Sequence, residues 1–184
     1  MYRNIDNWEV DTKRLKIRKL TTEDVLDYFQ IFGNPVICRY DDFIPISLDE
    51  ATNWLPLAIN NYSNPKTEQE WAVEEVATGK LIGILYFNPT VDPASIGYHF
   101  NETFHGMGYA SEALSAVVRS LFRDYAIHRI QANMDARNLA SAKLCERIGM
   151  RREAHFIQDY WSKGEWTDSY VYALLEGDLA DRES

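Results

Sequence analysis

The sequence predicts an α/β fold in which helices flank a mixed, mostly antiparallel sheet. Residues 70–87 and 160–172 are each rich in apolar, aromatic or β-branched residues around a turn that contains glycine, which is typical of antiparallel hairpins. Between them, strands at 95–101 and 129–134 flank a helix at 108–124, the order of a parallel crossover unit. We therefore expect one sheet and one domain over the 184 residues.

The first part of the chain contains a strand, two helices and a loop. Residues 1–12 are polar and lack periodicity, so we expect an N-terminal arm. Apolar and charged residues alternate over 14–20, as in a half-buried strand. Pairs that resemble capping boxes open helices at 21–32 and 48–62, and Asn-Pro sequences follow both. The segment 38–47 between them is predicted to be a loop.

Strands and helices alternate in the second part of the chain. Residues 81–85 are apolar throughout, which predicts a central strand buried on both faces. Helix 108–124 repeats its apolar residues with a period of about 3.6, so one face should pack on the sheet. Helix 138–148 ends at Gly149, and Met150 is placed for the apolar contact that commonly follows a glycine cap.

The composition is that of a soluble globular chain. Apolar residues make up 46% and charged residues 26%, and no apolar run has the length of a membrane span. No signal peptide opens the chain, so we expect a cytoplasmic protein without a membrane partner. The net charge of −9 argues against a nucleic-acid partner and favours a cationic substrate. Cys38 and Cys145 are too few for a disulfide framework or a zinc site.

A glycine turn, His-Gly-Met-Gly-Tyr-Ala at 105–110, joins the strand 95–101 to the helix that follows. Its glycines let the backbone approach a ligand closely, and the N–H groups and dipole of the helix start attract anions. The turn therefore predicts a phosphate cradle. A Walker loop is excluded because no Gly-Lys-Ser or Gly-Lys-Thr occurs. A dinucleotide-binding loop, as in an NAD-dependent oxidoreductase, fits less well because Ser111 takes the place of its third glycine.

A second motif, Asn-Leu-Ala-Ser at 138–141, lies further along the chain, and its helix closes with Ile-Gly-Met at 148–150. Together the two motifs resemble the Gcn5-related N-acetyltransferase (GNAT) family, whose cradle holds the pyrophosphate of coenzyme A. Gly108 and Ala110 fit the family pattern, whereas His105 replaces its Gln or Arg. The resemblance implies the acyl-CoA N-acyltransferase fold, in which the sheet splays beside the cradle strand to form a slot for the pantetheine arm.

The resemblance covers nearly the whole chain beyond residue 12 and is closest to the branch that acetylates the N-termini of ribosomal proteins. Ile96-Gly97-Tyr98 and Trp166-Thr167-Asp168 carry that likeness. It implies an N-acetyltransferase domain with acetyl-CoA as cosubstrate and no metal. The residues expected to bind the coenzyme are Phe100, Asn101, His105, Gly106, Gly108, Tyr109, Ala110, Asn138 and Lys143.

The same resemblance suggests three catalytic candidates. In that branch, the serine that matches Ser141 is proposed to protonate the departing thiolate. Tyr160 occupies the place where some relatives carry an acid that acts as the general base. Glu102, just after the strand that precedes the cradle, is the other candidate for the base.

The acceptor is expected to be a primary amine, most simply the α-amine of a protein N-terminus. Deprotonating an α-amine at neutral pH costs about 1 kcal/mol, whereas a lysine-like amine costs about 4–5 kcal/mol. The alternatives are a small amine such as a polyamine or aminoglycoside, or a non-catalytic acyl-CoA sensor. Two adjacent acids in the loop 40–43 suit an amine at the substrate wall. A homodimer is also compatible with the sequence.

Overall fold

The computed structural model describes residues 8–64 and 67–180, and within them eight strands form one sheet. Their order is β1-β2-β3-β4-β5-β6-β8-β7. β5 and β6 pair in parallel and the other neighbours are antiparallel, so the predicted mixed, mostly antiparallel sheet is confirmed. The strands are β1 (Val10–Asp11), β2 (Leu15–Lys19), β3 (Gln69–Glu75), β4 (Lys80–Phe87), β5 (Ala94–Phe100), β6 (Arg129–Asp135), β7 (Arg151–Ser162) and β8 (Glu165–Leu175).

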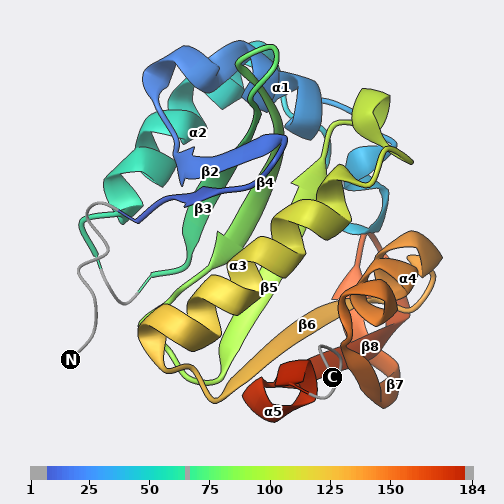
Figure 1. Ribbon diagram of the computed structural model, residues 1–184. Coiled ribbons are helices and arrows are strands. Elements are labelled where there is room, and N and C mark those ends of the chain that lie inside the picture. Colours follow the sequence, from blue (N-terminus) through green and yellow to red (C-terminus); the bar gives the residue numbers. More distant parts are fainter. Residues whose placement is uncertain (1–7, 65–66, 181–184) are drawn as a thin grey trace.

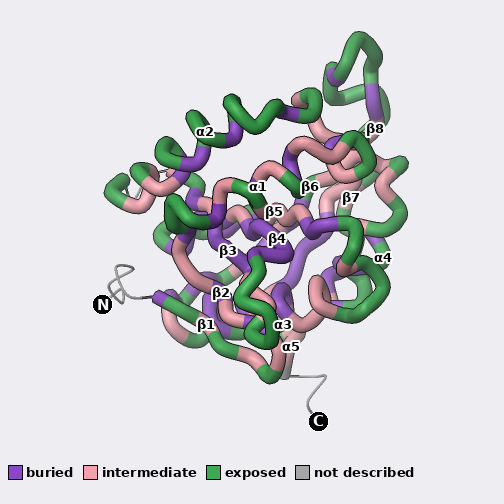
Figure 2. The backbone as a smooth tube through the Cα atoms, turned by 90° about the horizontal axis from the view of Figure 1, so that it is seen from above, coloured by how far each residue is buried: buried purple, intermediate pink, exposed green. Residues whose placement is uncertain are grey.

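Helices cover both faces of the sheet. α1 (Val25–Phe32) and α2 (Leu48–Asn61) pack together on one face, and α3 (Tyr109–Tyr125) runs diagonally across the other (Figure 1). α4 (Leu139–Ile148) packs against α3 and the strands β6 to β8. Seen from above, the buried strands lie between the α1–α2 layer and α3 (Figure 2). No helix within 8–64 and 67–180 combines the length and apolar character needed to cross a bilayer.

Alternation along β3 and β4 divides the core into two layers. Trp71 and Ile82 pack with α3, whereas Ala72, Leu81 and Ile84 pack with α1 and α2. Because both faces of β4 are covered, its apolar run is buried throughout, as the sequence predicted. Each helix layer therefore covers one face of the central strands.

The N-terminal arm is described only from residue 8, and this part packs on the sheet. Trp8 is buried, its ring lies 4.5 Å from the ring of Trp71, and its Nε1 donates to Ser120 Oγ at 3.1 Å. β1 then pairs with β2. Trp8 is flanked by polar residues in the sequence, so no apolar periodicity predicted that this segment packs on the sheet. Residues 1–7 of the expected arm lie outside the described residues.

The C-terminal hairpin is longer than the predicted segment 160–172, because β7 begins at Arg151 and β8 ends at Leu175. Nearly every residue of β7 is exposed, so no apolar alternation marks it. Irregular register also breaks the strand period, and Gln158 has a positive φ of 50°. A short helix, α5 (Glu176–Ala180), follows without having been predicted.

β5 and β6 part soon after they meet. Their register pairs involve only Ala94 and Ser95 of β5. β5 stays paired with β4 from Ile96 to Phe100, and β6 stays paired with β8 as far as Asp135. The sheet therefore opens along the strand where the resemblance implied a splay.

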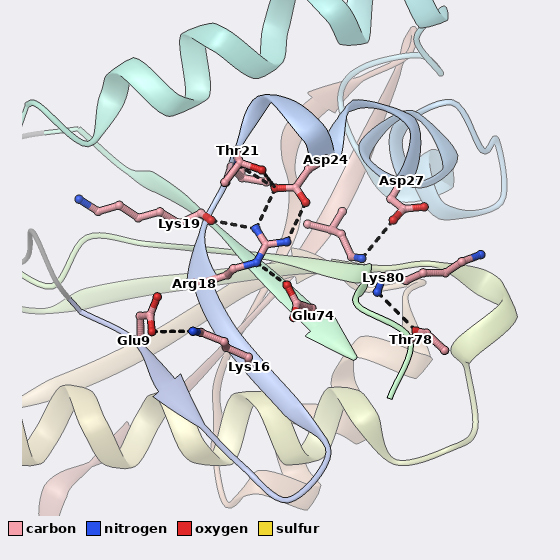
Figure 3. A network of polar contacts seen from close by, with 12 residues as sticks. Glu9, Lys16, Arg18, Lys19, Thr21, Asp24, Asp27, Glu74, Thr78 and Lys80 are labelled. Atoms are coloured by element: carbon pink, nitrogen blue, oxygen red, sulfur yellow. Dashed lines mark hydrogen bonds and ion pairs between the residues drawn. The ribbon is translucent and has the colours of Figure 1, made fainter. Parts of the chain in front are cut away.

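Arg18 of β2 joins three segments through a charge cluster (Figure 3). Its guanidinium donates to both carboxylate oxygens of Asp24 at 2.8 Å and to Glu74 at 2.6 Å. The Asp24 side chain is only 7% exposed and also accepts the Thr21 N–H, as the predicted capping pair requires. Burial alone would raise the pKa of Asp24, but the hydrogen bonds from Arg18 and Thr21 lower it below its ordinary value.

Replacing Arg18 by Met should leave the Asp24 carboxylate buried without its partner. We expect the free energy of unfolding at pH 7 to fall by about 3–5 kcal/mol. The lowered pKa means that Asp24 stabilises the fold above its ordinary pKa of 3.8 and loses this effect as pH falls through the folded-state value. Urea denaturation at pH 7 and pH 3 should therefore show a smaller gap between wild type and variant at pH 3.

Lys16→Met is the matched control, because Lys16 lies on the same strand as Arg18 and its ion pair with Glu9 is exposed, at 36% and 49% of the two side chains. An exposed ion pair contributes little to stability, so this variant should lose much less. Equal losses in the two variants would contradict the role given to the Arg18 cluster.

Candidate functional site

The opening between β5 and β6 continues into a cavity of about 1170 Å³. The two strands line it, together with residues of α3 and α4 from one face of the sheet. Residues 36, 37 and 39–43, with Tyr86 of β4, line it from the other face. Ligand pockets commonly measure about 300–1000 Å³, so this space suits two ligands that meet within the sheet.

One end of the cavity is the glycine turn before α3. Gly106 and Gly108 have left-handed φ values of 76° and 81°. A Cβ at Gly106 would meet nothing within 4 Å, and one at Gly108 would lie 3.5 Å from Arg14 Nη2, so conformation rather than crowding requires glycine. The first N–H groups of α3 have no acceptor within the helix, and Tyr109 and Ala110 line the cavity. The turn thus presents the positive end of α3 to a ligand.

Arg14, just before β2, braces this turn. Its Nη1 donates to the Met107 carbonyl at 3.0 Å, and its guanidinium lies 4.3 Å from the centre of the Tyr109 ring. Its Nε and Nη2 bind the carboxylate of Glu112, in the first turn of α3, at 2.7 and 2.6 Å. Burial alone would raise the pKa of Glu112, but hydrogen bonds from Thr12 and Arg14 lower it. Arg14 therefore neutralises Glu112, an acid that would repel an anion here.

Basic side chains gather at the same end. Lys143 and Arg147 of α4 line the cavity, and Arg147 Nη1 donates to Ser111 Oγ at 3.1 Å. His105 Nε2 lies 2.9 Å from the carbonyl oxygen of Phe100. A carbonyl can only accept, so Nε2 carries the proton, and His105 ties the turn to the end of β5. This end is locally positive although the chain carries a net charge of −9.

The start of α4 places two polar side chains beside β5. Asn138 Oδ1 accepts the Ser141 N–H at 3.1 Å, which caps the helix and leaves the amide Nδ2 as a donor. Ser141 Oγ lies 2.7 Å from the hydroxyl of Tyr98, which also contacts Cys145 Sγ at 3.4 Å. Burial raises the pKa of Tyr98, and it raises that of Cys145 to about 11, so both keep their protons at neutral pH. A pair of hydroxyls therefore lies at the opening.

The other end of the cavity is acidic and aromatic. Asp41 Oδ2 lies 3.0 Å from His99 Nε2, and His99 Nδ1 lies 3.2 Å from the Tyr86 hydroxyl. Asp42 accepts a hydrogen bond from the Tyr160 hydroxyl at 2.9 Å. No cluster of His, Cys, Asp and Glu in the described ranges has the arrangement of a metal site. The cavity therefore runs from a cationic end to an anionic one.

Two of the predicted site residues do not line this cavity. Asn101 is 7% exposed, and its side chain binds Gln30 and the Thr103 N–H. Glu102 is exposed and accepts a hydrogen bond from Asn34. The predicted residues that do line the cavity are Phe100, His105, Gly106, Gly108, Tyr109, Ala110, Asn138, Ser141, Lys143 and Tyr160.

Neither predicted candidate for the general base is well placed to accept a proton. Tyr160 lines the cavity, but its hydrogen bond to the Asp42 carboxylate raises its pKa, which disfavours the phenolate that a base would need. Glu102 lies outside the cavity lining. Neither side chain therefore offers a ready proton acceptor at the opening.

Sequence reasoning did not select Tyr98, His99 or Asp41 as reacting groups. Alternation along a strand sends the adjacent Tyr98 and His99 to opposite faces, and this signal was present in the sequence. Asp41 lies 58 residues from His99 along the chain, so no local sequence pattern could predict their contact.

Comparison with known proteins agrees with this architecture. Residues 14–151 match the model of the acetyltransferase (GNAT) domain. The uncharacterized N-acetyltransferase YnaD of Bacillus subtilis is 28% identical over 170 residues, which cover 91% of this chain and 96% of YnaD. The [ribosomal protein uS5]-alanine N-acetyltransferase of Escherichia coli is 31% identical over 103 residues, 54% of this chain and 53% of that enzyme.

A solved structure extends the likeness to the whole fold. The crystal structure of a GNAT-family acetyltransferase from Bacillus anthracis is 27% identical with a TM-score of 0.82, covering 92% of this chain and 99% of that chain. The family match spans most of the chain, from β2 to α4. The protein therefore belongs to the GNAT family and is an N-acetyltransferase.

Proposed function

We propose that this enzyme transfers the acetyl group of acetyl-CoA to the α-amine of a protein N-terminus, by direct attack in a ternary complex. The observation that supports this proposal is the opposite charge of the two ends of the cavity. The glycine turn and two basic side chains occupy one end, and Asp41 and Asp42 occupy the other. Coenzyme A is anionic and an amine is cationic in water, so each end attracts one substrate.

The glycine turn is proposed to bind the pyrophosphate through N–H groups at the start of α3, with Lys143 and Arg147 adding positive charge. The edge of β5 that has parted from β6 offers backbone groups to the pantetheine arm, as an added strand would. Asn138 Nδ2 can donate to the same arm. His105 already donates to Phe100, so its contribution is to hold the turn rather than to neutralise phosphate.

Tyr98 and Ser141 are proposed to protonate the departing thiolate. They share a hydrogen bond of 2.7 Å at the opening, on the face of the sheet that carries α4. As the carbon–sulfur bond breaks, one hydroxyl gives its proton to sulfur and the other restores it through their hydrogen bond. Such general acid catalysis contributes about 10²–10⁴-fold.

An α-amine is favoured as the acceptor by its pKa. At neutral pH it reaches the nucleophilic form at a cost of about 1 kcal/mol, against about 4–5 kcal/mol for an alkylamine like that of lysine. The likeness to an enzyme named [ribosomal protein uS5]-alanine N-acetyltransferase supports a protein acceptor. The acids Asp41 and Asp42 would also suit a polyamine or an aminoglycoside, which makes small amines the second candidate.

An acceptor screen tests the proposal. CoA thiol release should appear with peptides that begin with free alanine or serine, and not with the same peptides blocked at the N-terminus. Spermidine and an aminoglycoside are tested in parallel as small-amine acceptors. Faster turnover of either small amine than of every free peptide would move the assignment to that class. Binding of acetyl-CoA without turnover of any acceptor would instead indicate an acyl-CoA sensor.

Gly108→Val should abolish most coenzyme binding, because a β-branched residue resists the left-handed backbone that the turn requires. In the wild type, acetyl-CoA at a hundredfold excess over Kd should stabilise the fold by about 2.7 kcal/mol, and NAD should not. Thermal shift with each ligand measures this. Gly79→Val is the control, because Gly79 has a similar φ of 70° with nothing within 4 Å and does not line the cavity.

The two glycine variants should lose similar intrinsic stability, but only Gly108→Val should lose the response to acetyl-CoA. A full acetyl-CoA response in Gly108→Val would mean that the cradle lies elsewhere.

Ser141→Ala and Tyr98→Phe should each lower kcat and kcat/KM together while the Kd for acetyl-CoA changes little. Because the thiolate of coenzyme A is a fair leaving group, we expect losses near the lower end of the usual range, about 10²-fold. The double variant should lose little more than the worse single one, since the two hydroxyls act as one donor pair. Wild-type kcat in both single variants would remove these hydroxyls from the chemistry.

A further inference from the structure

The proton that the acceptor amine loses needs a destination, and the structure offers one on the acceptor side. Asp41, His99 and Tyr86 form a chain of hydrogen bonds, with 3.0 Å from Asp41 Oδ2 to His99 Nε2 and 3.2 Å from His99 Nδ1 to the Tyr86 hydroxyl. They come from the loop after residue 40 and from the neighbouring strands β5 and β4. All three line the cavity.

The direction of each hydrogen bond follows from its chemistry. An ionised carboxylate only accepts, so Nε2 of His99 carries a proton and donates it to Asp41. In a neutral imidazole, Nδ1 is then the acceptor, and the Tyr86 hydroxyl donates to it. Burial raises the pKa of Tyr86 well above its ordinary value, so the resting phenol keeps its proton. Tyr86 can therefore pass a proton to His99 only as its oxygen accepts another proton in the same step.

Charged and aromatic side chains surround the imidazole of His99. Asp41 faces it from the loop, and the carboxylate of Glu70 on β3 interacts with it electrostatically. Rings of Phe32 from α1 and Phe43 from the loop pack against the imidazole, with centroids 5.4 and 6.2 Å away. The Tyr86 ring also packs edge-on against the imidazole, with 5.4 Å between the ring centroids.

His99 lies next to Tyr98 on β5. Tyr98 and His99 are adjacent, so their side chains leave the strand on opposite faces. Tyr98 contacts Ser141 on the α4 side, and His99 contacts Asp41 on the α1–α2 side. One strand therefore carries a proton donor for the thiolate on one side of the opening and a proton acceptor for the amine on the other.

We propose, on the basis of the function proposed above, that Tyr86, His99 and Asp41 relay the proton away from the acceptor amine. As the amine nitrogen bonds to the thioester carbon, its proton passes to the Tyr86 oxygen while the Tyr86 proton passes to His99 Nδ1. The imidazolium that forms is stabilised by Asp41. The carbon–sulfur bond then breaks, the thiolate takes a proton from the Tyr98–Ser141 pair, and solvent later restores both sites.

The pH dependence of kcat/KM tests the relay, using a peptide with a free N-terminal alanine, or spermidine if the screen selects it. The wild type needs two deprotonated groups, the amine and His99, so log kcat/KM should rise with a slope approaching two at acid pH. In His99→Gln the slope should fall to one, with a loss of about 10²-fold or more at neutral pH. Tyr86→Phe should lose activity to a similar extent, because the amine then has no path to His99.

His155→Gln is the matched control. His155 Nε2 also pairs with an aspartate, Asp168, at 3.2 Å, but neither residue lines the cavity. This variant should keep the steep slope and the neutral-pH activity. The thermal response to acetyl-CoA, measured in every variant, shows that the coenzyme site is intact.

The outcomes separate this inference from the function on which it rests. Failure of acetyl-CoA to stabilise the wild type would overturn the proposed function. A normal acetyl-CoA response in His99→Gln, with the steep slope kept and activity within about threefold of wild type, would overturn the relay alone. Full activity in Tyr86→Phe would also overturn it, since the path through that hydroxyl would then be unnecessary.

Discussion

The early parting of β5 and β6 is the constraint on which the rest of the site depends. Each strand keeps its other neighbour, so the sheet does not close again after Ser95. Backbone groups inside a protein need hydrogen-bond partners, and those on the open edge of β5 face the cavity. A strand edge that the fold leaves unpaired within its own sheet is therefore available to an extended ligand, such as the arm of a coenzyme.

The open sheet also gives one cavity two ends of opposite charge. α3 and α4 lie on one face and bring a helix N-terminus, Lys143 and Arg147. The α1–α2 side brings Asp41 and Asp42. Because β5 lies between these sides, strand alternation directs its successive side chains toward one side or the other.

Arginines near the N-terminus hold the frame around this opening. Arg14 fixes the glycine turn and neutralises Glu112, and Arg18 joins β2 to Asp24 and to β3. Both pair with acids in a chain of net charge −9, so local pairing decides the electrostatics of the site more than the overall sign does. The anion end can be positive on an acidic protein for this reason.

The sequence by itself determined the order of the main strands and helices, the buried central strand and the glycine turn, because these follow from local periodicity and backbone conformation. It did not reveal the part of β7 before residue 160, whose exposed residues carry no apolar alternation, nor β1, α5 or the packing of Trp8. Only the tertiary structure decided which polar groups meet. Ser141 joins Tyr98, and Asp41 joins His99, across separations of 43 and 58 residues, and no local pattern records contacts made through folding.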